Sequence, residues 1–254
     1  MNLRNAFSQL GLSKQLVIAH ASLRAFGSVE ASAVLDALLE TTRGVIMPTF
    51  TYKTMLNPEV GPPHNGITYG SEADLNKMAE PYRPDMPVDK LMGILPEVLR
   101  NHPKARRSSH PIQSFAGINA DAIVNAQTIY EPLAPIAALA ERDGWVLLLG
   151  VDHRVNTSIH YAEKLSGRMQ FIRWALTPGR VVECPGFPGD SEGFNAIAPA
   201  VEKFPRRVEV GNALVQAVPL RNLIHAVMDA IRDNPLALLC GRPDCERCEA
   251  VRWG

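Results

Sequence analysis

The sequence has no excess of charge of either sign, because 26 lysines and arginines balance 26 aspartates and glutamates across 254 residues. A nucleic-acid-binding protein needs a positive excess to neutralise phosphates, and so does a polybasic membrane-binding surface. Apolar runs are far shorter than the roughly 20 residues that span a bilayer. The first ten residues, MNLRNAFSQL, lack the continuous apolar stretch of a secretory signal. We therefore expect no nucleic-acid partner and no membrane.

Cysteine is also scarce, with four residues in the whole chain. Without a secretory signal, four cysteines do not indicate a disulfide scaffold, and a reducing cytoplasm is the expected location. A hydrophobic content of 46% and a charged content of 20% are ordinary globular values, which argues against disorder. The length can bury a sizeable core, and we expect residues 1–254 to form one domain.

Several motifs that define known enzyme classes are missing. The segment HASLRAFG at residues 20–27 lies between a predicted strand and a predicted helix, a place that suits an anion. It lacks the glycine spacing of a Rossmann fingerprint or a P-loop, and an ordinary loop is the alternative. The chain has no HExxH motif, which disfavours a zincin. It also lacks a Gly-x-Ser-x-Gly elbow, which disfavours a serine hydrolase.

Hydrophobic periodicity predicts alternating strands and helices. Strands at residues 15–20 and 45–50 flank a helix at 29–42, which is typical of a parallel βαβ unit. Further strands are predicted at 114–118, 145–150, 171–176, 180–184 and around 208–218, and helices at 92–102, 135–143, 156–166, 194–204 and 220–233. The predicted fold class is α/β, or mixed α+β, with a central, largely parallel sheet flanked by helices.

Residues 51–91 interrupt this alternation. They contain six prolines and three glycines and show no periodicity. A long irregular segment inside a compact domain is usually functional or disordered. We expect a long functional loop here.

Two segments carry side chains suited to catalysis or binding. RRSSHP at residues 106–111 combines guanidinium and hydroxyl donors that suit a phosphate, with a surface turn as the alternative. NTSIHYAE at 156–163 follows the strand at 145–150, beyond whose carboxyl end α/β proteins place ligands. His160 and Glu163 are three residues apart and share a helix face. Such a pair is a candidate general base, or simply a solvated pair on a helix.

Taken in order, HASLRAFG, VIMPTF, the proline-rich loop, GILPEVLRNHPKARRSSHP, SFAG and DGWVLLLGVDHRVNTSIHYAE resemble the aminoglycoside 3-N-acetyltransferase family. This resemblance covers nearly the whole chain. It implies the antibiotic N-acetyltransferase fold, a role in antibiotic resistance, and direct acetyl transfer from acetyl-CoA to the 3-amino group of an aminoglycoside. An enzyme of the same fold acting on another amino sugar or small amine, with little or no drug activity, is the alternative. The partners would be CoA and the acceptor amine, and the chain would be a monomer or homodimer.

The resemblance also assigns roles to residues. It makes His160 the general base that takes a proton from the attacking amine, oriented by Glu192. Glu163 would contact the cationic acceptor, and Thr157 or a backbone N–H would face the thioester oxygen. The residues implied to contact acetyl-CoA are His20, Ala21, Ser22, Leu23, Ser108, His110, Pro111 and Ser114. At residues 131–135 the chain reads EPLAP where the family often has Gly-x-x-Ser-Pro, so the acceptor-side loop is expected to differ.

The tail at residues 240–248 concentrates three of the four cysteines. They are Cys240, Cys245 and Cys248. Their spacing is zinc-like, but a closed structural site needs a fourth ligand. Resemblance to a branch of the family with a cysteine cluster implies Asp190 as that ligand, with Cys184 as second choice. A structural zinc here would fix the loop of Glu192 and support His160 from a distance. Reduced thiols without a metal are the alternative.

Overall fold

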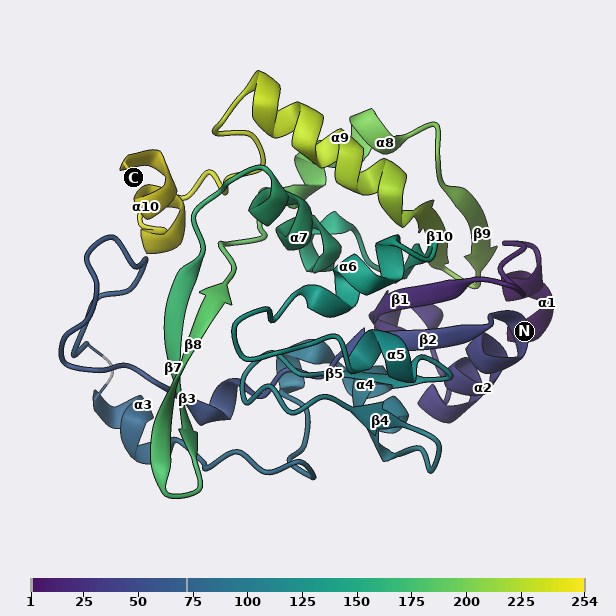
Figure 1. Ribbon diagram of the computed structural model, residues 1–254. Coiled ribbons are helices and arrows are strands. Elements are labelled where there is room, and N and C mark those ends of the chain that lie inside the picture. The colour runs from purple at the N-terminus through teal and green to yellow at the C-terminus, as the bar shows by residue number, and fades with distance from the viewer. Residues whose placement is uncertain (1, 72, 254) are drawn as a thin grey trace.

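The structure is a computed structural model that describes residues 2–71 and 73–253 (Figure 1). Residue 72, within the predicted functional loop, and residues 1 and 254, the ends of the predicted domain, lie outside the described residues. The described strands form a seven-stranded sheet and a three-stranded sheet.

The strands of the large sheet are β1 (Leu16–Ala21), β2 (Gly44–Pro48), β4 (Arg106–Arg107), β5 (Phe115–Ile118), β6 (Trp145–Leu149), β9 (Arg206–Val210) and β10 (Ala213–Pro219). Those of the small sheet are β3 (Met55–Leu56), β7 (Phe171–Thr177) and β8 (Arg180–Phe187). The α-helices are α1 (Leu3–Ser8), α2 (Ala31–Thr41), α3 (Ala73–Met78), α4 (Ile94–Asn101), α5 (Asp121–Val124), α6 (Ala134–Ala140), α7 (Ser158–Leu165), α8 (Ala198–Val201), α9 (Leu220–Asp233) and α10 (Glu246–Trp253). Short 3₁₀ helices lie at Leu23–Phe26, Tyr52–Thr54, Lys90–Met92, His153–Val155 and Phe194–Ile197.

The large sheet is mixed, in the order β4-β5-β2-β1-β6-β10-β9. Its three central strands, β2, β1 and β6, are parallel, as predicted from the βαβ pattern. The outer strands pair antiparallel, β5 with β2, β4 with β5, β10 with β6 and β9 with β10. The α/β class is therefore confirmed, and the parallel arrangement is confined to the centre of the sheet.

Two predicted elements are each divided in the structure. The single strand predicted around residues 208–218 is the β9–β10 hairpin, which turns at Gly211 with φ 63°. A Gly-Asn pair between alternating apolar residues is a hairpin signal, and this explains the division. The helix predicted at 194–204 is a 3₁₀ turn followed by α8, whose first turn contains Pro199. Proline lacks a backbone N–H, so it is tolerated at a helix start and not in its interior.

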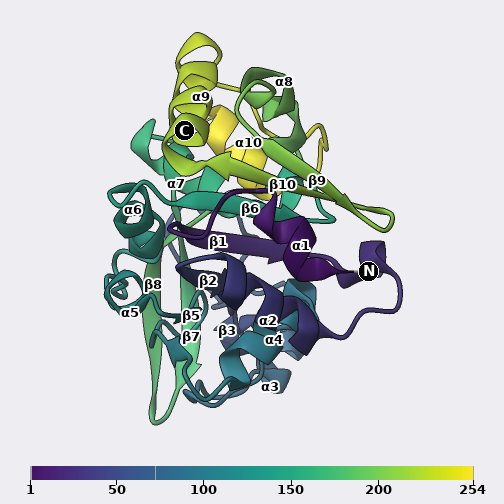
Figure 2. The same ribbon diagram turned by 90° about the vertical axis from the view of Figure 1, so that its right-hand side faces the viewer.

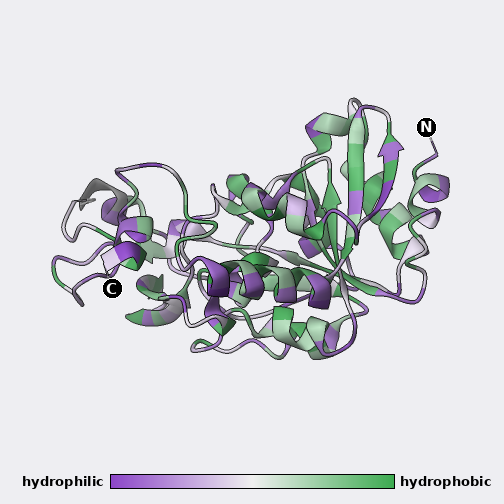
Figure 3. Cartoon of the chain, turned by 90° about the horizontal axis from the view of Figure 1, so that it is seen from above, coloured by the Kyte–Doolittle hydropathy of each residue, from purple (hydrophilic) through white to green (hydrophobic). Residues whose placement is uncertain are grey.

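Helices cover both faces of the large sheet (Figure 2). Successive side chains of a strand point to opposite faces, so each central strand contributes to two cores. Ile18 and Val146 pack in the core beneath α5, α6, α7 and α9, whereas Val17 and Leu147 pack in the core beneath α1, α2 and α4. Figure 3 shows hydrophobic residues concentrated along the central strands and hydrophilic residues on the outer helices. Among the described residues, no helix is long and apolar enough to cross a membrane.

The predicted loop at 51–91 contains short elements that attach it to the small sheet. Its strand β3 pairs antiparallel with β7, at Met55 with Ala175 and Leu56 with Trp174. The small sheet has its own apolar cluster, which consists of Ile112, Phe171, Ala175, Cys184, Phe187 and Ala250. The presence of Ala250 in this cluster shows that α10 packs against the small sheet.

Candidate active site and metal cluster

A cavity of about 350 Å³ lies at the carboxyl ends of the central parallel strands. Its wall includes residues that end β1 and follow β2, the start of α7, residues 187–192, and two arginines of the cysteine-rich tail. The side chains with polar or ionisable groups in this wall are His20, Tyr52, Arg154, Asn156, Thr157, His160, Asp190, Ser191, Glu192, Arg242 and Arg247. This is the edge at which parallel α/β sheets bind ligands.

His160 is the best-positioned candidate base in this wall. It lies in the first turn of α7, just after β6, and is 8% exposed. Its Nδ1 is 2.8 Å from Oε2 of Glu163, and its ring packs edge-on against Phe194 with centroids 4.7 Å apart. The three-residue spacing on one helix face produces this contact, as the sequence predicted.

The carboxylate of Glu163 is held from its other side by Arg168. Nη1 of Arg168 donates to Oε1 of Glu163 at 2.6 Å, and Nη2 donates to the carbonyl oxygens of Pro235 and Ala237, both at 2.8 Å. Both members of this buried ion pair are therefore held by further contacts: Glu163 by His160, and Arg168 by two backbone carbonyls. The oxygens of an ionised carboxylate can only accept, so opposite such a Glu163 the Nδ1 of His160 carries a hydrogen. In the neutral imidazole the lone pair is then on Nε2.

Arg168 was not identified from the sequence. It follows Gly167, just beyond the end of α7, and no motif spacing distinguishes it there. The one available signal is that Arg168 lies just over one helical turn after Glu163, which α7 buries. Burial of that glutamate is a tertiary property, which a single sequence does not display.

The two glutamates lie in places different from those expected. Glu192 lines the cavity with its side chain 58% exposed, and its charged neighbour is Arg154, at 4.0 Å. Glu163 is only 1% exposed, has both oxygens engaged by His160 and Arg168, and is not part of the cavity wall. The contact with His160 expected of Glu192 is made by Glu163, because both residues of that pair project from α7.

The first predicted acetyl-CoA segment reaches the cavity in part. His20 and Ala21 line it, whereas Ser22 and Leu23 continue into a 3₁₀ turn outside its wall. Nε2 of His20 is buried with no hydrogen-bond partner among the described residues. Burial, aided by nearby His153, lowers the pKa of His20 to about 3, so this imidazole is neutral.

The second predicted acetyl-CoA segment lies behind the cavity wall. Ser114 Oγ donates to the Thr49 carbonyl at 2.7 Å, and the Pro111 carbonyl accepts from Thr51 Oγ1 at 2.6 Å. Ser108 and His110 are also hydrogen-bonded. Ser108 Oγ accepts from the backbone N–H of Phe115 at 2.8 Å, and His110 Nδ1 accepts from the backbone N–H of Gln113 at 2.9 Å. Burial lowers the pKa of His110 to about 4. Pro111 and Ser114 therefore support residues 49–51, which include Phe50 of the cavity wall, whereas Ser108 and His110 bond within their own segment. None of the four lines the cavity.

Thr157 lies at the N-terminus of α7 and lines the cavity at 9% exposure. It shares the wall with His160, three residues further along the chain. Its hydroxyl is a donor beside the candidate base, whereas the backbone N–H groups of Ser158, Ile159 and His160 already donate to Asn156 and Thr157.

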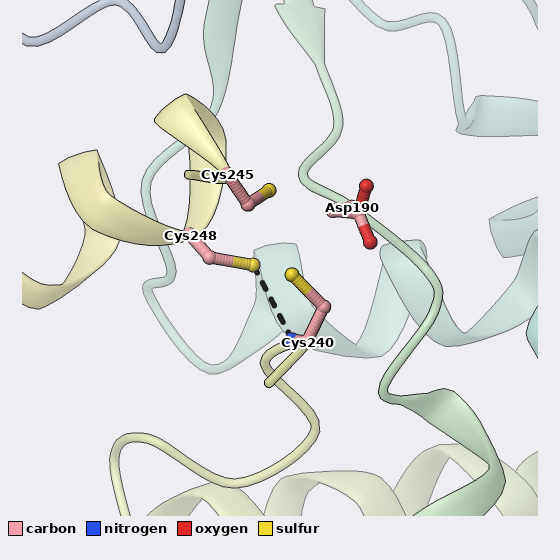
Figure 4. Close-up of side chains that lie close together, drawn as sticks. All are labelled: Asp190, Cys240, Cys245 and Cys248. Carbon is pink, nitrogen blue, oxygen red and sulfur yellow. Dashed lines mark hydrogen bonds between the residues drawn. The ribbon is translucent and has the colours of Figure 1, made fainter. Parts of the chain in front are cut away.

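The four residues predicted first as metal ligands converge (Figure 4). The ligand atoms of Asp190, Cys240, Cys245 and Cys248 all lie within 4.8 Å of one another, and all four residues are buried. The backbone N–H of Cys240 donates to Sγ of Cys248 at 3.3 Å. Cys184, the second choice as fourth ligand, packs instead in the core of the small sheet, where burial raises the pKa of its thiol to about 12. Three thiols and one carboxylate are donors that zinc accepts.

The loop from Asp190 to Gly193 is fixed onto the tail. Oδ2 of Asp190 accepts from Arg242 Nη2 at 2.8 Å and from Arg247 Nη2 at 3.3 Å, and Oδ1 accepts the N–H of Glu192 at 3.0 Å. A Cβ on Gly193 would lie 2.4 Å from the carbonyl oxygens of residues 238 and 239. The cluster of Asp190 and the three cysteines therefore shares one loop with the cavity wall, and neither arginine was identified from the sequence.

A helix-covered mixed sheet with a cavity at the carboxyl ends of its parallel strands is the arrangement of an α/β enzyme, and the buried histidine–carboxylate pair there is a candidate general base. The family model for aminoglycoside 3-N-acetyltransferase matches residues 18–232. The chain therefore belongs to the aminoglycoside 3-N-acetyltransferase family.

Individual relatives match parts of the chain. Aminoglycoside N(3)-acetyltransferase IV of Salmonella sp is 36% identical over 92 residues, which are 34% of this chain and 35% of that protein. The SPbeta prophage-derived aminoglycoside N(3')-acetyltransferase-like protein YokD of Bacillus subtilis (strain 168) is 32% identical over 167 residues, 61% of this chain and 60% of that protein. The matches thus span less than two thirds of either relative.

Solved structures show the same fold over nearly the whole chain. The apoenzyme of aminoglycoside acetyltransferase AAC(3)-IVa has a TM-score of 0.77 and 24% identity, covering 99% of this chain and 95% of that one. A histidine-to-alanine variant of AAC(3)-IVa was crystallised in complex with a gentamicin, and matches with a TM-score of 0.77 and 23% identity over the same shares of the two chains.

Proposed function

We propose that the protein is an acetyl-CoA-dependent N-acetyltransferase that acetylates the 3-amino group of an aminoglycoside. The observation that carries this proposal is the buried chain from His160 through Glu163 to Arg168, with His160 in the wall of a cavity. Family membership supports acetyl transfer, and the gentamicin complex of AAC(3)-IVa supports an aminoglycoside acceptor.

The proposed reaction is direct transfer within a ternary complex. The nitrogen of the neutral acceptor amine attacks the carbonyl carbon of the thioester, a C–N bond forms, and the C–S bond breaks with CoA leaving as a thiolate. The proton lost by the amine goes to Nε2 of His160 and from there to the departing sulfur. Glu163 stabilises the imidazolium that forms, and Arg168 pairs with Glu163 and keeps its carboxylate oriented.

The cavity is large enough for the reacting end of acetyl-CoA and an amine, but not for the whole cofactor. We place the thioester beside His20 and Ala21, with Ser22 and Leu23 along the path of the cofactor. The segment of Ser108, His110, Pro111 and Ser114 holds this wall from behind. As the carbonyl oxygen gains negative charge, either Thr157 or a backbone N–H donates to it.

The charge of the wall gives weight to a second acceptor class. Three arginines and two carboxylates line the cavity: Arg154, Arg242, Arg247, Asp190 and Glu192. Both Arg242 and Arg247 contact Asp190, which leaves Glu192 as the acidic group for a cationic ligand. A polycation gains little from such a wall, so another amino sugar or small amine is the alternative acceptor.

A thiol-release assay tests the reaction and separates the two acceptors. Purified protein receives acetyl-CoA together with each member of a panel of aminoglycosides, amino sugars and small amines. We expect release of CoA thiol with an aminoglycoside, and turnover restricted to small amines would favour the alternative. Loss of turnover in His160→Ala, with retained rates in the exposed control His225→Ala, is expected. Wild-type rates in His160→Ala would exclude the proposed base.

We propose further that Asp190, Cys240, Cys245 and Cys248 hold a structural zinc ion. The buried thiols and the carboxylate fit a closed four-ligand site. When bound, the metal would cross-link the three cysteines of the tail to the loop that contains Asp190. Elemental analysis of protein purified without chelator is expected to give about one zinc per chain, and Cys245→Ser is expected to lose it. Metal-free wild-type protein would leave the reduced-thiol alternative.

We also propose a cytoplasmic location, which the four unpaired cysteines support. An oligomeric state of monomer or homodimer stays a prediction, which light scattering on the purified protein would decide.

A further inference from the structure

The metal cluster meets the active-site cavity through one side chain. Arg247 lies between two of the cysteines in the sequence and lines the cavity of His160. It also lines a neighbouring cavity of about 850 Å³, whose wall includes Asn57 and Ile67 of the 51–91 loop. The residues common to both walls are Tyr52, Leu91, Phe187 and Arg247. Arg247 therefore stands at the partition between the two cavities.

The guanidinium of Arg247 is held by the loop that carries Glu192. Its Nη1 donates to the Gly189 carbonyl at 3.0 Å, and its Nη2 donates to Asp190 at 3.3 Å. Its side chain is 32% exposed. A zinc ion with three thiolates and one carboxylate carries two negative charges in excess, and two arginines, Arg242 and Arg247, lie against that carboxylate to balance them.

Helix α10, which contains Arg247, also supports residues 57–71. Gly66 has φ 54°, and a Cβ built on it would lie 2.8 Å from Cγ and 2.9 Å from Cα of Arg247. Two residues further on, the Thr68 hydroxyl donates to the carboxylate of Glu246. The 57–71 segment therefore packs directly on the turn of α10 that the cysteines define.

Different segments of the chain line most of each cavity. The end of β1, where we place the thioester, lines only the first cavity, and the 51–91 loop supplies most of the second. This arrangement assigns the second cavity to the acceptor. An acceptor there would reach His160 across the partition at Arg247.

We propose that Arg247 is a positioning residue that couples the metal cluster to acceptor binding. The cluster fixes α10, α10 fixes Arg247 and the 57–71 segment, and these shape the acceptor cavity. The proposal rests on the proposed acetyl transfer and zinc site. Loss of the metal or of Arg247 weakens acceptor binding and leaves proton transfer at His160 unchanged.

Hydrogen exchange measured by mass spectrometry tests the coupling without any substrate. Chelator-treated wild-type protein and metal-loaded Arg247→Ala are both expected to exchange faster over residues 57–71, with the central strands unchanged. The matched control is Arg252→Ala, on the same helix, where Nη2 donates to the Cys240 carbonyl at 3.0 Å and the side chain lines neither cavity. Unchanged exchange over 57–71 after metal removal would overturn the proposal, and so would identical behaviour of Arg247→Ala and Arg252→Ala.

Steady-state kinetics give the second readout, using the acceptor with the highest turnover in the thiol-release assay. Arg247→Ala is expected to raise the acceptor KM about tenfold, with kcat and the acetyl-CoA KM within about twofold. Metal removal should raise the acceptor KM by a smaller factor in Arg247→Ala than in the wild type, because the two changes share the path through Arg247. Independent, multiplying effects or a fall in kcat alone would contradict the coupling. If no acceptor is turned over, the proposed function fails in that assay, and the exchange experiment still decides the coupling.

Discussion

The two ends of the active-site cavity are held together by different forces. At the His160 end, apolar cores lie on both faces of the large sheet, and Phe194 and α9 belong to the core behind α7. At the tail end, the buried cluster consists of three cysteines with Leu239 packed against it. Apolar packing and the buried Glu163–Arg168 ion pair together hold His160, whereas cysteines and partly exposed arginines around Asp190 hold the opposite wall. The two ends should therefore respond differently to loss of a charge, loss of a metal and change of pH.

Loss of a buried charge partner should give the largest effect on stability. Arg168→Met removes the partner of Glu163, whose side chain is 2% exposed, and leaves a buried carboxylate unpaired. We expect a loss of about 3–5 kcal/mol in the free energy of unfolding, measured by urea denaturation. Arg242→Ala at the tail end is the comparison: the Arg242 side chain is 56% exposed and the buried Asp190 keeps Arg247 as a charge partner, so we expect a loss below about 1 kcal/mol. Equal losses would show that the two ends do not differ in this respect.

Glu163→Gln should act on catalysis more than on binding. A glutamine amide facing Nδ1 of His160 can donate, which places the ring hydrogen on Nε2 and removes the base. We expect kcat to fall by roughly 10²–10⁴ at nearly unchanged KM. The same substitution at the exposed Glu192 should lower kcat far less. A larger effect at Glu192 would return the orienting role to that residue.

Removal of the metal should destabilise the tail selectively. A ligand present at about 100 times its dissociation constant stabilises the folded state by about 2.7 kcal/mol. Chelation is therefore expected to expose residues 240–253 to limited proteolysis while the large sheet stays resistant. Mass spectrometry of the first cleavage products would locate the cut, and a first cut within the large sheet would refute the contrast.

The smallest expected effect is a pH dependence from the buried histidines. The pKa of His110 is lowered by burial to about 4, from 6.5 when unfolded, so the unfolded state binds its proton first as pH falls. Stability is thus full above about pH 6.5 and falls towards pH 4, by roughly 1 kcal/mol per pH unit for this group. His110→Asn keeps an acceptor for the Gln113 N–H and should make the slope of unfolding free energy against pH shallower. His20, whose pKa is lowered in the same way, retains its share of the slope. An unaltered slope in His110→Asn would show that His110 is not a source of the dependence.

The sequence predicted those parts of the molecule that depend on local pattern. The apolar runs of β1, β2 and β6 and the spacing of His160 and Glu163 are visible in one chain, and the structure contains both. The convergence of Asp190 with the cysteines was anticipated through the family resemblance. The antiparallel outer strands depend on long-range pairing, which periodicity does not encode.

The same limit explains which site residues were missed or misplaced. Arg168, Arg242 and Arg247 act through partners that are distant in the sequence or buried only by the fold. Glu192 was expected to orient His160, but the helix geometry of α7 gives that contact to Glu163. The sequence thus predicted His160, Glu163 and the cysteine cluster, whereas the arginines that hold them depend on tertiary packing.

Gly193 carries a consequence for how sequences of this kind can diverge. A side chain there would collide with the carbonyl oxygens of residues 238 and 239, so the loop and the tail fit only as a matched pair. A chimera that exchanged the segment after α9 for that of another protein would have to preserve this backbone path. Inheritance of the tail and of the Asp190–Gly193 loop should therefore be linked, and their joint presence is a signature for finding chains built in the same way.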